Sequence, residues 1–199
     1  MLRYLLDAFS GPAAIFMYGL LAMLAFALAV IVDRGLFFVR NRRDARAVVA
    51  RVELAVRGGS RADLGTSPLE QVLSAGLAHP PDLGAEAMQA AAVDAEESVR
   101  KRISYLAAIA SIATMLGLTG TVYGLILAFG ALGSVAAAER ASRLSEGSST
   151  AMATTAFGLF VAIPALAAHA VFEAQARSML AAIEGAAGRV HVFRKAEGR

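Results

Sequence analysis

Residues 103–129 contain no charged side chain, and this stretch most constrains what the chain can fold into. About 20 consecutive apolar residues are enough for a helix to cross a hydrocarbon core about 30 Å thick. The stretch is also rich in small and hydroxyl-bearing residues, namely Ser111, Thr114, Gly117, Thr119, Gly120, Thr121 and Gly124. A helix surrounded by lipid would not use these residues, so we predict a membrane span that packs against protein on at least one side.

Two further apolar segments, residues 13–32 and 148–172, predict two more spans. The chain is 57% hydrophobic, above the roughly 45–50% of soluble domains. The first segment is longer than the apolar part of a signal peptide, and its positive charges follow it, so we expect a span rather than a cleaved leader. Pro164, inside the third segment, is compatible with a membrane helix because neighbouring helices can satisfy the freed carbonyl.

The predicted class is therefore an all-α membrane protein with three transmembrane helices. The predicted segments are an outer-side segment 1–12, span 13–32, a cytoplasmic helical loop 33–102, span 103–133, a short periplasmic loop 134–147, span 148–172 and a cytoplasmic C-terminal helix or tail 173–199. Residues 85–102 contain no helix breaker and run directly into the second span. One helix over residues 85–133 would measure about 75 Å at 1.5 Å per residue. We expect the second and third helices to extend from the membrane into the cytoplasm.

The distribution of lysine and arginine predicts the orientation. Sixteen of these residues lie in segments 33–102 and 173–199, whereas Arg3, Arg140 and Arg143 lie on the opposite side. Positive charge is retained on the cytoplasmic side of a membrane, so we expect a periplasmic N-terminus and a cytoplasmic C-terminus. The arginines flank apolar segments without interleaved aromatic residues, which argues against binding to nucleic acid.

Hydroxyl and small residues recur at helical spacing on the second and third spans. Thr114 and Thr121 are two turns apart, Thr150 and Thr154 are one turn apart, and Gly120 and Gly124 have GxxxG spacing. Such residues either allow close helix packing or line a polar interior, and their presence on two helices joined by a short connection favours the interior. We expect Thr114, Thr121, Thr150, Thr154 and Thr155 to line a pore, and Gly117, Gly120, Gly124, Gly158 and Pro164 to serve helix packing.

The spans contain no Asp, Glu, Lys or Arg, although an ion pathway normally needs a titratable group. His169 lies alone near the cytoplasmic end of the third span, where we expect a packed or water-facing residue. Glu146 is a candidate acid at the outer mouth, with a solvated loop charge as the alternative. The chain has no cysteine and no combination of residues typical of an enzyme or a metal site, so we expect no enzyme, cofactor or metal.

Two motifs resemble those of the MotA/TolQ/ExbB proton-channel family, closest to its ExbB/TolQ branch. Residues 116–129 read LGLTGTVYGLILAF, similar to the GLLGTVxGMIxAF pattern of the family's second membrane helix. Residues 154–172 read TTAFGLFVAIPALAAHAVF, similar to its ATAxGLxxAIPA pattern. The resemblance covers about residues 68–172.

This resemblance implies a subunit of an inner-membrane motor that couples the proton-motive force to work on the cell envelope. It implies a ring of copies, typically five, around the single spans of an ExbD/TolR-like partner that carries a membrane aspartate. Thr121 and Thr155 occupy the positions that face that aspartate. The chain departs from the family at Thr150, where many members have glutamate, at Thr114, where proline is usual, and at Ala168-His169, which replace a Tyr-Asn-like pair. The missing glutamate keeps open an alternative, a non-conducting membrane scaffold with the same fold.

Overall fold

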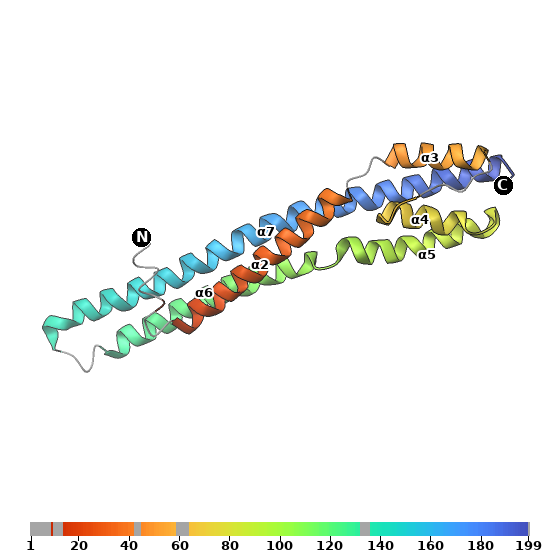
Figure 1. The fold of residues 1–199 in the computed structure, drawn as a ribbon. Helices are drawn as coiled ribbons and strands as arrows, with labels where there is room; N and C mark the ends of the chain where they lie inside the picture. The colour runs from red at the N-terminus through yellow and green to blue at the C-terminus, as the bar shows by residue number, and fades with distance from the viewer. Residues whose placement is uncertain (1–8, 10–13, 42–44, 59–63, 132–135, 199) are drawn as a thin grey trace. The chain divides into compact units, whose positions relative to one another are not determined.

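The structure is a computed structural model that describes the chain except for residues 1–8, 10–13, 42–44, 59–63, 132–135 and 199. Its helices are α2 (Ala14–Arg40), α3 (Ala45–Arg57), α4 (Pro68–Leu77), α5 (Pro81–Arg100), α6 (Ile103–Ala131) and α7 (Ala137–Ala196) (Figure 1). The predicted all-α class is confirmed, and the described residues include no strand. The predicted outer-side segment 1–12 lies almost wholly outside the described residues.

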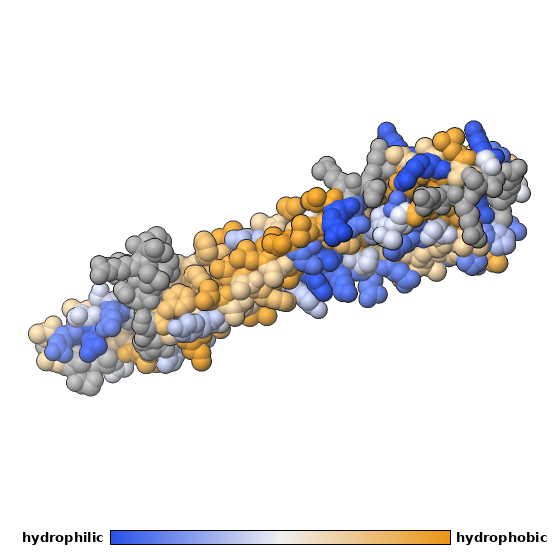
Figure 2. All heavy atoms as spheres, viewed as in Figure 1, coloured by the Kyte–Doolittle hydropathy of each residue, from blue (hydrophilic) through white to orange (hydrophobic). Residues whose placement is uncertain are grey.

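Three stretches in the described part of the chain are long and apolar enough to cross a membrane. They are Ala14–Arg40, Asp82–Gly130, which covers nearly all of α5 and α6, and Ala138–Ala196, which forms most of α7. Large apolar side chains are exposed along them, as the surface over α2 in Figure 2 shows. Exposed apolar surface of this extent is the expected boundary with lipid or with neighbouring protein. The predicted number of spans is confirmed, whereas ring assembly stays a prediction.

The chain divides into two compact units. The first unit contains residues 1–33 and 102–170, so it holds most of α2, all of α6 and the first part of α7. In this unit α2 packs against both other helices. Met17 of α2 is fully buried with Ala153 of α7, and a Cβ atom on Gly19 would lie 3.1 Å from Leu116 of α6.

The second unit contains residues 34–101 and 171–199 and has a core of aliphatic side chains. The core joins α3, α4, α5 and the last part of α7, with Val48, Val49, Val52, Leu69, Val72, Leu73, Met88, Ala95, Ile183, Ala186 and Val190 buried. The three valines of α3 recur at helical spacing, which explains why one face of this short helix is buried. This unit therefore has its own aliphatic core.

Helix α4 begins with a capping box. The Ser67 hydroxyl accepts a hydrogen bond from the Glu70 N–H, and the Glu70 carboxylate accepts one from the Ser67 N–H. Arg51 of α3 also donates to Glu70, with 3.2 Å between Nη2 and Oε1. These bonds explain how an almost fully buried glutamate is tolerated in the core of the second unit.

Two differences from the predicted segments have local causes. The expected continuous helix 85–133 is interrupted at Lys101 and Arg102, where Arg102 has a left-handed backbone with φ of 65°. That conformation costs roughly 1 kcal/mol, and the ion pair of 3.1 Å between Arg102 and Asp33 lies beside it. Residues 137–147, expected as a loop, instead form the first turns of α7 because they are rich in alanine and charged helix formers.

Arg194, near the end of α7, is buried and caps the end of α4. Its Nη1 donates to the carbonyl of Gly76 at 2.6 Å and its Nη2 to the carbonyl of His79 at 2.9 Å. A Cβ atom on Gly84 would lie 2.9 Å from both Nη1 and the Gly76 oxygen, so glycine leaves room for the guanidinium. The last carbonyls of a helix have no partner within the helix, and here the arginine provides one.

Replacing Arg194 by leucine is expected to loosen the α4–α5 connection. A hydrogen bond to a charged group contributes about 1.5 kcal/mol or more, so amide hydrogen exchange in residues 76–84 should accelerate by about tenfold or more. Lys195→Leu is the matched control, because Lys195 is the exposed neighbour. Unchanged exchange in Arg194→Leu would show that the arginine does not hold this connection.

Candidate functional site: the contact between α6 and α7

Helices α6 and α7 meet along a strip of small residues, which we call the glycine seam. It consists of Gly117, Gly120 and Gly124 on α6 and Gly147, Ala151, Thr154 and Gly158 on α7. A Cβ atom on Gly117 would lie 3.2 Å from the Gly158 Cα, and one on Gly124 would lie 3.1 Å from the Ala151 Cβ. The two backbones therefore approach closely because side chains are missing, as in other membrane helix pairs.

Gly147 belongs to the glycine seam although the sequence placed it at the end of a loop. A Cβ atom on Gly147 would overlap the Cβ of Ala128. The spacing of small residues in the sequence already indicated this, because Gly147 precedes Ala151 by one helical turn and so continues the same strip. Pro164, expected to take part in packing, lies in α7 with its side chain exposed.

The predicted site threonines occupy different places around this contact. Thr154 is fully buried, and its hydroxyl donates to the Ala151 carbonyl of its own helix. It lies against Gly120, whose Cβ atom would come within 2.7 Å of the Thr154 Oγ1. Within the chain Thr154 has no exposed surface to offer to a pore, and it contributes to the packing of the two helices.

Thr155 joins the two helices by a hydrogen bond. Its hydroxyl donates to the carbonyl of Gly117 on α6, with 3.0 Å between the oxygens. In an α-helix each N–H donates to the carbonyl four residues earlier, so the Gly117 carbonyl lies one turn from Thr121. The bond therefore places Thr155 beside Thr121 across the helix pair. Thr121, which is half-buried, donates its own hydroxyl proton to the Leu118 carbonyl.

Thr121 and Thr155 lie on the side of the helix pair that faces away from α2. At about 100° per residue, Thr121 is about 140° around α6 from Leu116, which contacts α2. Thr155 is about 160° around α7 from Phe157, which packs against the Met17 cluster. Thr114 lies within about 20° of Thr121 and is exposed. We call Thr114, Thr121 and Thr155 the threonine flank.

Thr150 and Glu146 lie outside the threonine flank. Thr150 is about 140° around α7 from Thr155, toward the side that α2 covers, and donates to the carbonyl of Glu146. The Glu146 carboxylate is exposed and forms a weak ion pair of 3.4 Å with Arg143. This arrangement is that of a solvated charge near the start of α7, and it does not bring the carboxylate to the threonines.

His169 is the one titratable side chain of the third predicted span, and it packs within the first unit. Its Nδ1 lies 3.2 Å from the carbonyl oxygen of Ile103, the first residue of α6. The carbonyl accepts, so this ring nitrogen carries the proton. The bond ties the start of α6 to α7, which the sequence did not indicate.

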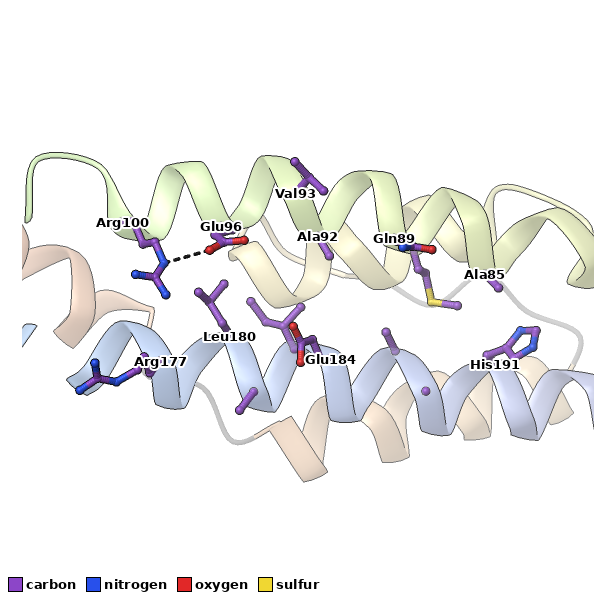
Figure 3. Close-up of a pocket in the computed structure, with 15 residues that line it drawn as sticks. Ala85, Gln89, Ala92, Val93, Glu96, Arg100, Arg177, Leu180, Glu184 and His191 are labelled. Atoms are coloured by element: carbon purple, nitrogen blue, oxygen red, sulfur yellow. Dashed lines mark ion pairs between the residues drawn. The ribbon is translucent and has the colours of Figure 1, made fainter. Parts of the chain in front are cut away.

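A groove of about 650 Å³ lies in the second unit, between α5 and α7 (Figure 3). Ala92 and Leu180 form part of its apolar lining, and Glu96 and Arg100 at one end form an ion pair of 3.0 Å. The groove contains none of the predicted site residues. The described residues contain no group of three His, Cys, Asp or Glu side chains that could hold a metal ion.

The fold and the α6–α7 contact define a three-span membrane protein whose second and third spans share a glycine seam and a hydroxyl-bearing flank. Residues 65–185 match the profile of a family described as the MotA/TolQ/ExbB proton channel family. The match covers more than half of the chain, so the chain belongs to this family. It contains the whole glycine seam and the whole threonine flank.

Two curated relatives are Tol-Pal system proteins named TolQ. The protein from Pseudomonas aeruginosa is 35% identical over 109 residues, which is 55% of this chain and 44% of that protein. The protein from Haemophilus influenzae is 42% identical over 73 residues, which is 37% of this chain and 32% of that protein. The chain thus matches less than half of the length of these curated relatives.

Proposed function

We propose that this chain is a proton-conducting subunit of an inner-membrane complex that couples the proton-motive force to work on the cell envelope. The observation that carries the proposal is the threonine flank, a hydroxyl surface without any charged residue in the spans that form it. Family membership and the TolQ relatives support the same conclusion. Thr150 and Thr154 are not part of the proposed lining, because they lie on other sides of α7.

The absence of an acid in the three spans requires a partner. A proton pathway needs a group that binds and releases the proton inside the membrane. We infer that a single-span TolR/ExbD-like protein supplies an aspartate that meets Thr121 and Thr155. Copies of this chain, five by analogy with the family, would surround the partner's spans in the bilayer. The N-terminus would be periplasmic and the C-terminus cytoplasmic, as the distribution of arginine and lysine predicts.

Proton flux into vesicles tests this proposal. The chain is co-expressed with a TolR-type subunit, purified as a complex and reconstituted with a pH-sensitive dye inside the vesicles. A potassium diffusion potential then drives proton movement. We expect acidification with the complex, and none with this chain alone or with a partner whose membrane Asp is replaced by Asn.

The alternative is a non-conducting scaffold with the same fold. It remains open because Thr150 stands where many members of the family have glutamate. Under that alternative the complex would purify normally, while proton flux would equal that of empty vesicles. Flux that is independent of the partner would contradict the proposal in another way, because the titrating group would then lie in this chain.

A further inference from the structure

The hydroxyl groups of the threonine flank have a common orientation. Each of the three donates its proton to a backbone carbonyl: Thr114 to Ala110 at 2.9 Å, Thr121 to Leu118 at 2.5 Å and Thr155 to Gly117 at 3.0 Å. A threonine hydroxyl has one proton and two lone pairs. With the proton in use, each oxygen has only lone pairs to offer to a group on the open side.

Reversing this orientation would break existing bonds. Thr155 could turn its proton outward only by losing its bond to α6, and the other two would lose bonds within their own helix. Each loss is unfavourable, and it is more unfavourable in an apolar setting where the free proton finds no other acceptor. Ser111, one turn before Thr114, is exposed and has no such bond in the described structure, so it does not belong to this set.

The spans that form the flank contain no lysine or arginine that would hold a negative charge. Residues 103–131 and 147–172 include no lysine or arginine, and His169 at the far end of the third span donates to the Ile103 carbonyl. A carboxylate needs hydrogen-bond donors or a cation when it leaves water. A carboxylic acid in its protonated form needs an acceptor for its one proton, and the flank provides acceptors.

We propose that the threonine flank acts as an acceptor-only wall that binds the partner's acid in its protonated, neutral form and disfavours the carboxylate. This inference rests on the proposed function and adds the charge state that the site selects. Hydrogen bonds to the neutral form of an acid make its proton harder to remove. The acid therefore keeps its proton while it lies beside Thr121 and Thr155 and releases it to water on leaving them. The threonines themselves neither gain nor lose a proton.

The test is an equilibrium titration, which does not depend on conduction. The complex with a TolR-type subunit is purified with carbon-13 in the partner's aspartate carboxyl groups. The infrared carbonyl band of the protonated acid is then followed against pH in vesicles made permeable to protons. Thr121→Val and Thr155→Val each remove the acceptor oxygen of the hydroxyl and leave a side chain of nearly the same shape. We expect the titration midpoint to fall by about half to one pH unit, the equivalent of one hydrogen bond.

Thr119→Val is the matched control. Thr119 lies on the same helix and donates to its own Met115 carbonyl, but it is about 160° around α6 from Thr121. The titration midpoint of the partner's acid in the Thr119→Val complex should equal that in the unchanged complex. The Thr155→Ser complex, which keeps the hydroxyl, should have the same midpoint. A midpoint that rises in the valine variants would show that the threonines donate to a carboxylate. A rise of this kind, or no shift at all, would overturn the acceptor-only wall but would not contradict the proposed proton conduction. Absence of proton flux in the unchanged complex would overturn both proposals.

Discussion

Replacing Thr155 by valine is expected to reduce proton flux through the complex by at least tenfold. The substitution removes the hydroxyl that joins α7 to the Gly117 carbonyl and leaves a side chain of nearly the same volume. Loss of about 1.4 kcal/mol of stabilisation at the highest barrier corresponds to a factor of ten in rate. The measurement is the initial rate of dye acidification in vesicles that contain the chain and its TolR-type partner.

Two variants show whether this effect belongs to the hydroxyl and to its position. Thr155→Ser retains the hydroxyl and should retain at least half of the flux. Thr119→Val removes a hydroxyl that bonds within its own helix on another side of α6, and flux should be unchanged. If Thr155→Val conducts as well as the unchanged protein, Thr155 has no role in conduction. If Thr119→Val loses as much flux as Thr155→Val, the effect comes from general destabilisation of the spans.

Replacing Gly117 by valine is expected to separate α6 from α7. A Cβ atom at this position would lie 3.2 Å from the Gly158 Cα, 3.2 Å from the Thr154 carbonyl oxygen and 3.3 Å from the Thr155 Cα. All three are backbone atoms, so no side chain can turn aside to make room. Overpacking of this kind costs about 1–3 kcal/mol before any loss of hydrogen bonds. The melting temperature of the purified complex should therefore fall, and proton flux should be lost with the Thr155–Gly117 bond.

Gly130→Val provides the matched control on the same helix. A Cβ atom on Gly130 would meet nothing within 4 Å, so valine there changes helix propensity without a steric conflict. Its melting temperature and its proton flux should remain close to those of the unchanged protein. Equal behaviour of the two valine variants would mean that the glycine seam does not determine how closely the helices approach.

The sequence was informative about the spans and the seam because both depend on local pattern. Long apolar stretches predicted three helices, and GxxxG spacing identified Gly120 and Gly124, which lie in the contact. The break at Arg102 was not predictable in the same way. Arginine is a good helix former, and nothing near it in the sequence indicates a left-handed backbone or an ion pair with Asp33, almost 70 residues earlier.

The candidate site was predicted in composition but not in geometry. Spacing placed Thr114 and Thr121 on one face, and it also placed Thr150 and Thr154 together on α7. The structure separates this second pair from Thr155, because Thr154 fills the space over Gly120 and Thr150 turns toward the side of α2. Which face of a helix is covered depends on the neighbouring helices, and no short sequence pattern contains that information.

The contact of Arg194 with the end of α4 has a consequence for the order of synthesis. The arginine lies 118 residues after Gly76, and Ile183 and Val190 of the same core are also made late. Helices α3, α4 and α5 therefore leave the ribosome before the residues that complete their core exist. The second unit can reach its final packing only after both later spans have been synthesised. Until then the core lacks the packing that Ile183 and Val190 provide, and incompletely packed apolar surface favours aggregation during folding.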